Sequence, residues 1–162
     1  MNAKQTLLQK IKDGTFALLT DDAIAKKLRL KGKAAEVLGE MLRSSVREGV
    51  LCCDLRGRYG TAEQFGAIRG TISGNERGFG FFVPDDPNRD DLFIPHRALR
   101  GAFHKDVVLA FAKNAAMGDE GEVLTILQRG YKEIVGTFRR ERTGGTLHPD
   151  DRKFSTDIFI PS

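Results

Sequence analysis

A repeat with a period of about 66 residues is the feature that most limits how this chain of 162 residues can fold. IRGT at Ile68 recurs as IVGT at Ile134, and DLFIP at Asp91 recurs as DIFIP at Asp157, each 66 positions later. Between them PDD recurs at Pro149, shifted by 65 positions, so one residue is lost and later regained. Such self-similarity indicates two copies of one structural unit.

Short β runs dominate the chain from Ala67 onward. AIRGTISG, GFGFFVP, DDLFIP, DVVLAFA and GEVLTILQ are separated by Gly, Pro, Asp and Asn, with no long helical pattern between them. They predict a small Greek-key barrel of the OB type over residues 67–130. IVGTFRR, GTLHP and TDIFIP then supply three strands of a second, truncated OB domain over residues 131–162. We expect this open sheet to be mobile, or to pair through its edges with the first barrel or with a second molecule. Its apolar residues would then seek burial elsewhere: Ile134, Phe138, Leu147, Ile158 and Phe159.

Residues 1–62 have the pattern of helices instead. KQTLLQKIKDG, DDAIAKKL and GKAAEVLGEMLRSSVREG carry apolar residues at helical spacing, and Thr20 precedes the second stretch as an N-cap. The third helix is expected to carry an apolar face made by Val37, Leu38, Met41, Leu42 and Val46. VLCCDL and RYGTA would form a two-stranded wing. The predicted fold is α+β and multi-domain: a winged helix-turn-helix, an OB barrel and a truncated second OB fold.

Composition narrows the class of protein. Hydrophobic residues make up 40% and charged residues 30% of the chain, as in a folded globular protein. No apolar run approaches the roughly 20 residues of a membrane span, and the N-terminus lacks the apolar core of a secretory signal. We therefore expect a cytoplasmic protein with no membrane partner. Cys52 and Cys53 are adjacent, which disfavours a disulfide between them, and no Cys or His has zinc-ligand spacing.

The run RGFGFFVPDD contains the candidate binding surface. In a strand, Phe79 and Phe81 share one face, while Gly80 and Phe82 lie on the other. Rings on an open face can stack against bases, and Phe93 in DLFIP could supply a third ring from the neighbouring strand. The alternative is that one or two of these rings are ordinary core, as Phe82 and Val83 could be.

Basic residues suggest a second contact with nucleic acid. Residues 1–60 hold 12 Lys/Arg against 7 Asp/Glu, whereas residues 61–130 hold 8 against 10, so the excess positive charge is N-terminal. Phosphate contacts here would be salt-sensitive and independent of sequence; the alternative is a solvated helix surface. The candidates lie at the helix-turn-helix corner and at the tip of the wing: Lys26, Lys27, Arg29, Lys31, Lys33, Arg56 and Arg58.

No catalytic or metal site is predicted. Asp85, Asp86, Asp90 and Asp91 sit together in one turn, whereas a two-metal site needs carboxylates that converge from several rigid elements. A solvated loop explains them better. We expect no catalytic residue, no metal ligand and no activity from this chain alone.

These motifs resemble a known family. RGFGFF is similar to the first ribonucleoprotein motif of cold-shock domains and DLFIP to the second, and two such repeats behind a winged helix resemble the N-terminal region of bacterial ribonuclease R. The resemblance implies RNA binding by Arg77, Phe79, Phe81, Phe93 and His96, with engagement of single-stranded and structured RNA. It also implies a 3′→5′ exoribonuclease whose magnesium-binding aspartates belong to a catalytic domain beyond Ser162.

The resemblance has departures, and a rival hypothesis remains. Pro95 occupies the position where cold-shock proteins commonly carry His, with His96 one residue later. In the second repeat, Gly145 and Leu147 are expected to match Phe79 and Phe81, so that copy keeps only the counterpart of Phe93, Phe159. The rival is a winged-helix regulator with a cold-shock barrel and no nuclease activity. Sequence preference and oligomeric state are not predicted.

Overall fold

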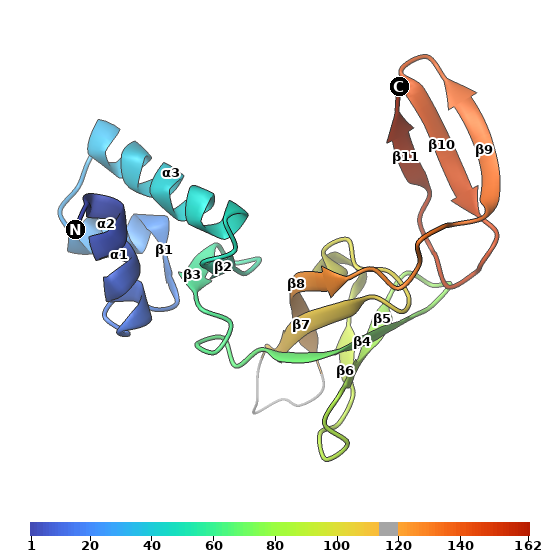
Figure 1. Ribbon diagram of the computed structural model, residues 1–162, viewed down its shortest axis with the longest axis horizontal. Coiled ribbons are helices and arrows are strands. Elements are labelled where there is room, and N and C mark those ends of the chain that lie inside the picture. Colours follow the sequence, from blue (N-terminus) through green and yellow to red (C-terminus); the bar gives the residue numbers. More distant parts are fainter. Residues whose placement is uncertain (114–119) are drawn as a thin grey trace. The chain divides into compact units, whose positions relative to one another are not determined.

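The computed structural model describes residues 1–113 and 120–162 (Figure 1). The chain divides into two compact units, Met1–Ala67 and Ile68–Ser162, and each is described by itself. The first unit is mainly helical, and the second is built of β-strands. The change from helical to strand periodicity expected at Ala67 coincides with the boundary between the units.

Three helices make up most of the first unit: α1 Ala3–Lys12, α2 Asp21–Lys27 and α3 Lys33–Arg47. A reciprocal capping box starts α1, because Asn2 Oδ1 accepts from the Gln5 amide at 2.9 Å and Gln5 Oε1 accepts from the Asn2 amide at 3.1 Å. The Thr20 hydroxyl caps α2 by accepting from the Ala23 amide at 3.1 Å, as predicted. The longest, α3, has 15 residues, and none of the described helices has the length and hydropathy needed to cross a membrane.

A small antiparallel sheet completes the first unit. Its strands are β1 Leu19–Thr20, β2 Cys52–Cys53 and β3 Arg58–Gly60, in the order β1-β3-β2. The sequence predicted β2 and β3 but missed β1. That strand is two residues long and pairs Leu19 with Tyr59, so its β conformation depends on a partner far along the chain rather than on local periodicity.

The core of the first unit lies where the helices meet this sheet. Leu38 and Leu42, one turn apart on α3, are buried against Ile11 and Ile24. Val37 was predicted to lie on the same face as Leu38 and Leu42, but it is exposed. A helix advances about 100° per residue, so Val37 falls at the border of the apolar stripe that Leu38 and Leu42 define.

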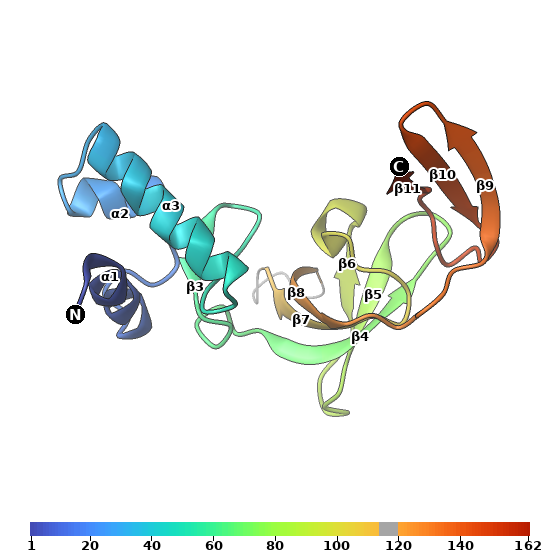
Figure 2. The ribbon, with the colours of Figure 1, turned by 45° about the horizontal axis from the view of Figure 1, so that its top comes forward.

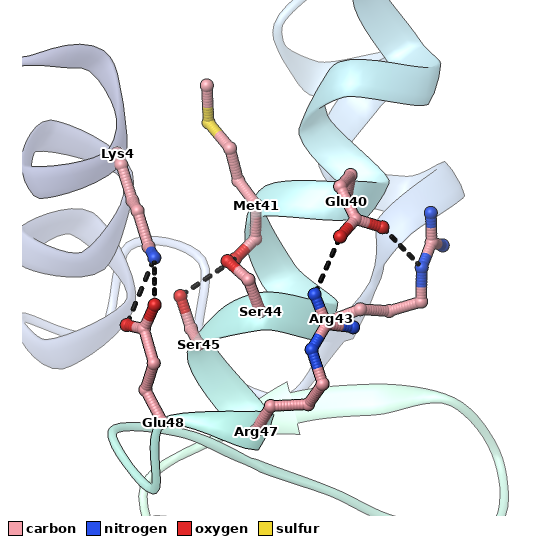
Figure 3. A network of polar contacts seen from close by, with 8 residues as sticks. All are labelled: Lys4, Glu40, Met41, Arg43, Ser44, Ser45, Arg47 and Glu48. Atoms are coloured by element: carbon pink, nitrogen blue, oxygen red, sulfur yellow. Dashed lines mark hydrogen bonds and ion pairs between the residues drawn. The ribbon is translucent and has the colours of Figure 1, made fainter.

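Polar side chains of α3 form contacts with one another and with α1 (Figure 3). Lys4 Nζ on α1 lies 2.8 Å from Glu48 Oε1 at the end of α3, which joins the two helices. On α3 itself, Glu40 accepts from Arg47 at 2.7 Å and from Arg43 at 3.4 Å. The hydrogen bond from Arg47 lowers the pKa of the Glu40 carboxyl. Three charged residues of this helix are therefore engaged with one another.

Five antiparallel strands form the larger sheet of the second unit: β4 Ile68–Gly74, β5 Gly80–Pro84, β6 Leu92–Ile94, β7 Val107–Ala112 and β8 Gly121–Gln128. Their order is β6-β5-β4-β7-β8, and a short 3₁₀ helix, η1 His96–Leu99, follows β6. A parallel bridge between Phe93 and Glu120 brings the two ends of the sheet together. The curled sheet (Figure 2) is consistent with the predicted OB-type barrel.

Phe82 is the central ring of this barrel. Its side chain is 0% exposed and packs in a core with Ile72, Ile94 and Val108. Gly70 on β4 makes room for the ring, since a Cβ there would lie 2.5 Å from a ring carbon of Phe82. The prediction that Phe82 is a core residue is confirmed.

The buried carboxylate of Asp106 forms hydrogen bonds with the residues that follow β8, the last strand of the barrel. Asp106 accepts from the amides of Phe103 and Gly130, each at 2.8 Å, and from Arg129 Nη1 at 2.7 Å. The Arg129 guanidinium also lies 5.1 Å from the centre of the Phe103 ring. Because the buried charge has three donors, the turn after β8 is held against the end of the barrel.

A second antiparallel sheet contains β9 Gly136–Glu141, β10 Gly144–Pro149 and β11 Ile158–Pro161, in the order β11-β10-β9. These strands correspond to the three runs predicted from the repeat. Thr146 pairs with Phe159 here, just as Phe81 pairs with Phe93 in the first sheet. The structural counterpart of Phe81 is therefore Thr146.

This pairing corrects the match of residues predicted from the sequence. Gly74 pairs with Gly80 across the first turn, whereas Arg140 pairs with Gly145 across the second, so the second turn is one residue shorter. The residue is lost within this turn, before β10. Gly144 rather than Gly145 consequently matches Phe79, Thr146 rather than Leu147 matches Phe81, and Leu147 matches Phe82.

The loop between β10 and β11 packs onto the first barrel through Phe154. Its ring is buried, with its centre 5.3 Å from that of Phe103 and 5.1 Å from that of Tyr131. The five apolar residues that were expected to seek burial all remain accessible: Phe138 and Phe159 are exposed, and Ile134, Leu147 and Ile158 are half-buried. The hydrophobic anchor of this segment is a loop residue that strand periodicity does not single out.

Candidate nucleic-acid interface

Three phenylalanine rings gather on the outer face of the first barrel. Phe79 precedes β5, Phe81 lies on β5, and Phe93 lies opposite Phe81 on β6. The ring centres are 5.8 Å apart for Phe79 and Phe81, 5.3 Å for Phe79 and Phe93, and 6.0 Å for Phe81 and Phe93. Phe81 is 41% and Phe93 36% exposed. We call these three side chains the aromatic face.

Strand alternation explains why Phe81 is exposed, whereas Phe79, which precedes β5, is half-buried. Along β5, Gly80, Phe82 and Pro84 are buried, while Phe81 and Val83 are exposed. The suggestion that Val83 could be a core residue is therefore wrong, because it shares the outer side with Phe81. Flat, exposed rings of this kind can stack with other flat groups, and purine and pyrimidine bases are such groups.

The turn between β4 and β5 places Arg77 and Phe79. An Asx turn shapes it, with the Arg77 amide donating to Asn75 Oδ1 at 2.8 Å, and Gly78 takes a φ of +98°. His96 Nδ1 lies 2.9 Å from the Gly78 carbonyl oxygen. A carbonyl oxygen only accepts, so Nδ1 carries the proton of this hydrogen bond. The structure thus brings three of the candidate RNA-binding residues, Arg77, Phe79 and His96, around one turn.

The corresponding face of the second sheet is polar. Thr146 stands where the first sheet has Phe81, and Phe159 remains exposed where the first has Phe93. A cavity of about 310 Å³ lies on this face, and a hydrogen bond joins His148 to Asp157 within its lining. The prediction that this copy lacks most of its stacking rings is confirmed, although two of the matched residues had to be corrected.

The basic residues proposed in the first unit differ in their surroundings. Lys31, Lys33 and Arg56 are exposed, and Lys33 Nζ makes only a 3.8 Å surface pair with Glu36. Arg58 is half-buried, and its Nη2 lies 2.6 Å from Oδ2 of the buried Asp54. Its guanidinium also lies 5.8 Å from the centre of the Phe65 ring. Lys31, Lys33 and Arg56 are therefore available to a ligand, whereas Arg58 already has a structural partner.

The sequence reasoning missed a cavity of about 340 Å³ next to Phe79. Its lining includes Arg97 on η1 and Lys153, Ser155 and Thr156 on the loop between β10 and β11. No local motif marks these residues. The repeat could have indicated that a long loop precedes β11, but not that this loop meets the first barrel.

The aspartates of the turn after β5 show no metal-binding geometry. Asp85 Oδ2 pairs with Arg69 at 2.9 Å, and Asp86 Oδ2 lies 3.8 Å from Arg89. Within residues 1–113 and 120–162, no group of three or more His, Cys, Asp or Glu side chains is arranged to hold a metal ion.

Comparisons with known proteins agree with this architecture. Residues 70–126 match the family described as the ribonuclease B OB domain. Ribonuclease R of Acidithiobacillus ferrooxidans is 33% identical over 150 residues, which are 91% of this chain and 34% of that protein. This chain is homologous to part of ribonuclease R.

Other relatives of the same name show a similar partial overlap. Ribonuclease R of Escherichia coli (strain K12) is 31% identical over 86% of this chain and 18% of its own length. That of Thermotoga maritima is 30% identical over 92% of this chain and 22% of its own length. The chain thus spans about a third or less of these ribonuclease R sequences.

One solved structure is also similar to part of the chain. It is Mycoplasma genitalium RNase R in complex with ribose methylated single-stranded RNA, matched at 18% identity and a TM-score of 0.41. The match covers 59% of this chain and 14% of that one. A superposition this loose places none of the present residues against that RNA, so the homology rests on the sequence relatives.

Proposed function

We propose that this chain is the RNA-binding portion of a ribonuclease R-like 3′→5′ exoribonuclease, and that the aromatic face stacks against the bases of single-stranded RNA. The observation that carries this proposal is the cluster of Phe79, Phe81 and Phe93, whose ring centres lie within 6.0 Å of one another on an exposed surface. Stacking of a base on an aromatic ring contributes about 1–3 kcal/mol. Arg77, in the turn that precedes Phe79, and His96, which contacts that turn, would contact phosphate or base edges.

The first unit is proposed to be a winged helix-turn-helix that engages structured RNA. The order of its three helices and the β2–β3 hairpin support this proposal. Exposed Lys31, Lys33 and Arg56 would contact phosphates without reading the sequence. In this proposal the domains span residues 1–62, 67–130 and 131–162, and the exposed edge of the last would permit self-association.

Hydrolysis is proposed to belong to a longer, cytoplasmic protein. The relatives named ribonuclease R extend well beyond the matched segment, and this favours a nuclease over a winged-helix regulator without nuclease activity. Magnesium would be needed for hydrolysis, but the described residues do not fit such a site: Asp85 and Asp86 lie in one exposed turn and pair with arginines. We therefore assign no catalytic residue to this chain.

Binding of fluorescently labelled single-stranded RNA of about ten nucleotides tests the central proposal. Phe79→Ala, Phe81→Ala and Phe93→Ala should each weaken binding measured by fluorescence anisotropy. Phe159→Ala is the matched control, because it removes an exposed phenylalanine from the other sheet. Equal affinity of all four variants and the parent chain would overturn the proposal. Incubation of the chain alone with RNA and Mg²⁺ should leave the RNA intact.

A further inference from the structure

The cavity beside Phe79 is built from three separate segments of the second unit. The turn between β4 and β5 contributes Gly78 and Phe79, η1 contributes Arg97, and the loop between β10 and β11 contributes Lys153 and Ser155. Its volume of about 340 Å³ lies at the lower end of the range for small-ligand sites, about 300–1,000 Å³. Phe79 borders both this cavity and the aromatic face, so the two surfaces are continuous.

The lining is positively charged. Arg97, Arg100 and Lys153 line the cavity, and no Asp or Glu does. Arg100 is already engaged, with Nη1 3.9 Å from Glu122 Oε2 and 3.4 Å from the Val123 carbonyl oxygen. Among the described residues, Arg97 and Lys153 have no ion-pair partner. Two cationic head groups therefore remain for an anionic ligand.

Packing of the adjacent residues against the first barrel fixes the position of Lys153. The adjacent Phe154 is buried against Phe103 and Tyr131. The Lys153 carbonyl oxygen approaches β4 so closely that a Cβ on Gly74 would lie 2.7 Å from it. The packing of this backbone against the barrel holds Lys153 at the edge of the cavity.

Of the two histidines that line this cavity, His96 and His104, the second favours its neutral form. His104 Nδ1 accepts from the Gly74 amide at 3.0 Å, which a protonated nitrogen could not do. Partial burial of the ring, together with the nearby charge of Lys153, lowers the pKa of His104. His104 therefore adds no positive charge at neutral pH to that of Arg97, Arg100 and Lys153.

We infer that this cavity holds the sugar–phosphate of the nucleotide next to a base stacked on Phe79, so that single-stranded RNA continues from the aromatic face onto the β10–β11 loop. The second repeat would then contact RNA through Lys153 and the hydroxyls of Ser155 and Thr156, although its own sheet face lacks the stacking rings. The inference rests on the proposed function of the aromatic face. Continuity through Phe79 and the cationic lining favour a polyanionic strand over a small neutral ligand.

Binding measured with RNA of two different lengths distinguishes the contribution of the cavity from that of the aromatic face. A trinucleotide whose bases stack on the three rings has no further nucleotide for the cavity, whereas a strand of about eight nucleotides also reaches it. Lys153→Ala and Arg97→Ala should each weaken binding of the longer RNA about three- to tenfold and reduce the slope of log affinity against log salt by about 0.7. Neither should change trinucleotide binding measured by NMR shift titration. Arg142→Ala is the control, since it removes one exposed charge at the opposite end of β10.

The outcomes distinguish this inference from the proposed function. Equal effects of Lys153→Ala, Arg97→Ala and Arg142→Ala on the longer RNA would overturn the inference, because the cavity would then contribute only through net charge. Weakened trinucleotide binding in Lys153→Ala would overturn it as well. Unchanged trinucleotide binding in Phe81→Ala would instead overturn the stacking proposal itself.

Discussion

Phe81 lies directly opposite Phe93 on adjacent strands, and their ring centres are 6.0 Å apart. The same register in the second sheet pairs Thr146 with Phe159. One copy of the repeat thus presents a pair of rings where the other presents a hydroxyl and a single ring. A surface suited to stacking is therefore confined to the first copy, and the two copies differ in the ligand chemistry that their faces can support.

Phe81 and its neighbour Phe82 should respond to truncation in opposite ways. Phe81→Ala should leave the fold nearly unchanged and weaken RNA binding by about 1–3 kcal/mol, because the ring is exposed. Phe82→Ala should lower the free energy of unfolding by about 3–5 kcal/mol, because it empties the centre of the core. Urea unfolding and RNA titration of both variants measure the two effects. Unfolding of the Phe81 variant would show that its ring belongs to the core.

Substitution of Arg58 should mainly lower stability, whereas substitution of Arg56 should mainly affect contact with phosphate. Arg58→Ala removes the partner of buried Asp54 and should lower the free energy of unfolding by about 2–4 kcal/mol. Arg56→Ala should leave stability within about 0.5 kcal/mol of the parent chain but flatten the salt dependence of RNA binding. Thermal unfolding and affinity measured at several salt concentrations provide the comparison. If Arg56→Ala leaves the salt slope unchanged, this surface faces solvent or a protein partner.

His104 should make the second unit less stable in mild acid. Burial and the charges of Lys153 and Lys105 lower its pKa below the usual 6.5, while Asp151 opposes them. The unfolded chain therefore binds a proton at a higher pH than the folded chain does. The contribution of His104 to stability is complete above about pH 6.5 and is lost as the pH falls through the lowered pKa.

Urea unfolding at pH 7.5 and pH 5 tests this pH dependence. His104→Gln should show a smaller loss of stability between the two pH values than the parent chain. His148→Gln is the control, because that ring is exposed on the second sheet. An identical loss in the parent and His104→Gln would assign the acid sensitivity to other groups.

Amide exchange should distinguish the two sheets of the second unit. The strands of the first barrel enclose a core of fully buried residues, whereas the second sheet leaves Phe138 and Phe159 exposed. We expect slow exchange across residues 67–112 and 120–129 and faster exchange across residues 136–161. Phe154→Ala should accelerate exchange in β10 and β11 further, because it removes the buried ring beside Phe103. Equal protection in both sheets of dilute monomer would contradict this expectation.

Local pattern was enough to predict several features of the chain. The alternation in RGFGFF placed Phe81 outside and Phe82 inside, and the residues of β5 follow it. The capping residue Thr20 predicted the start of α2, and the repeat predicted the three strands of the second sheet. These features depend on residues within one turn or strand, so their physical causes can be read from neighbouring positions.

Contacts between distant residues decided the rest. Strand β1 exists because Leu19 meets Tyr59, and the true counterpart of Phe81 became clear only from the pairing of Thr146 with Phe159.

The sequence by itself determined which side chains could stack or carry charge; only the tertiary structure decided which of them lie together. Arg58 was set apart from the other candidate phosphate contacts by Asp54, and Lys153 was brought to Phe79 by the burial of Phe154. Strand periodicity and charge counts describe one segment at a time. The cavity beside Phe79 requires three segments to pack against one another, and the position of each depends on side chains in the other two.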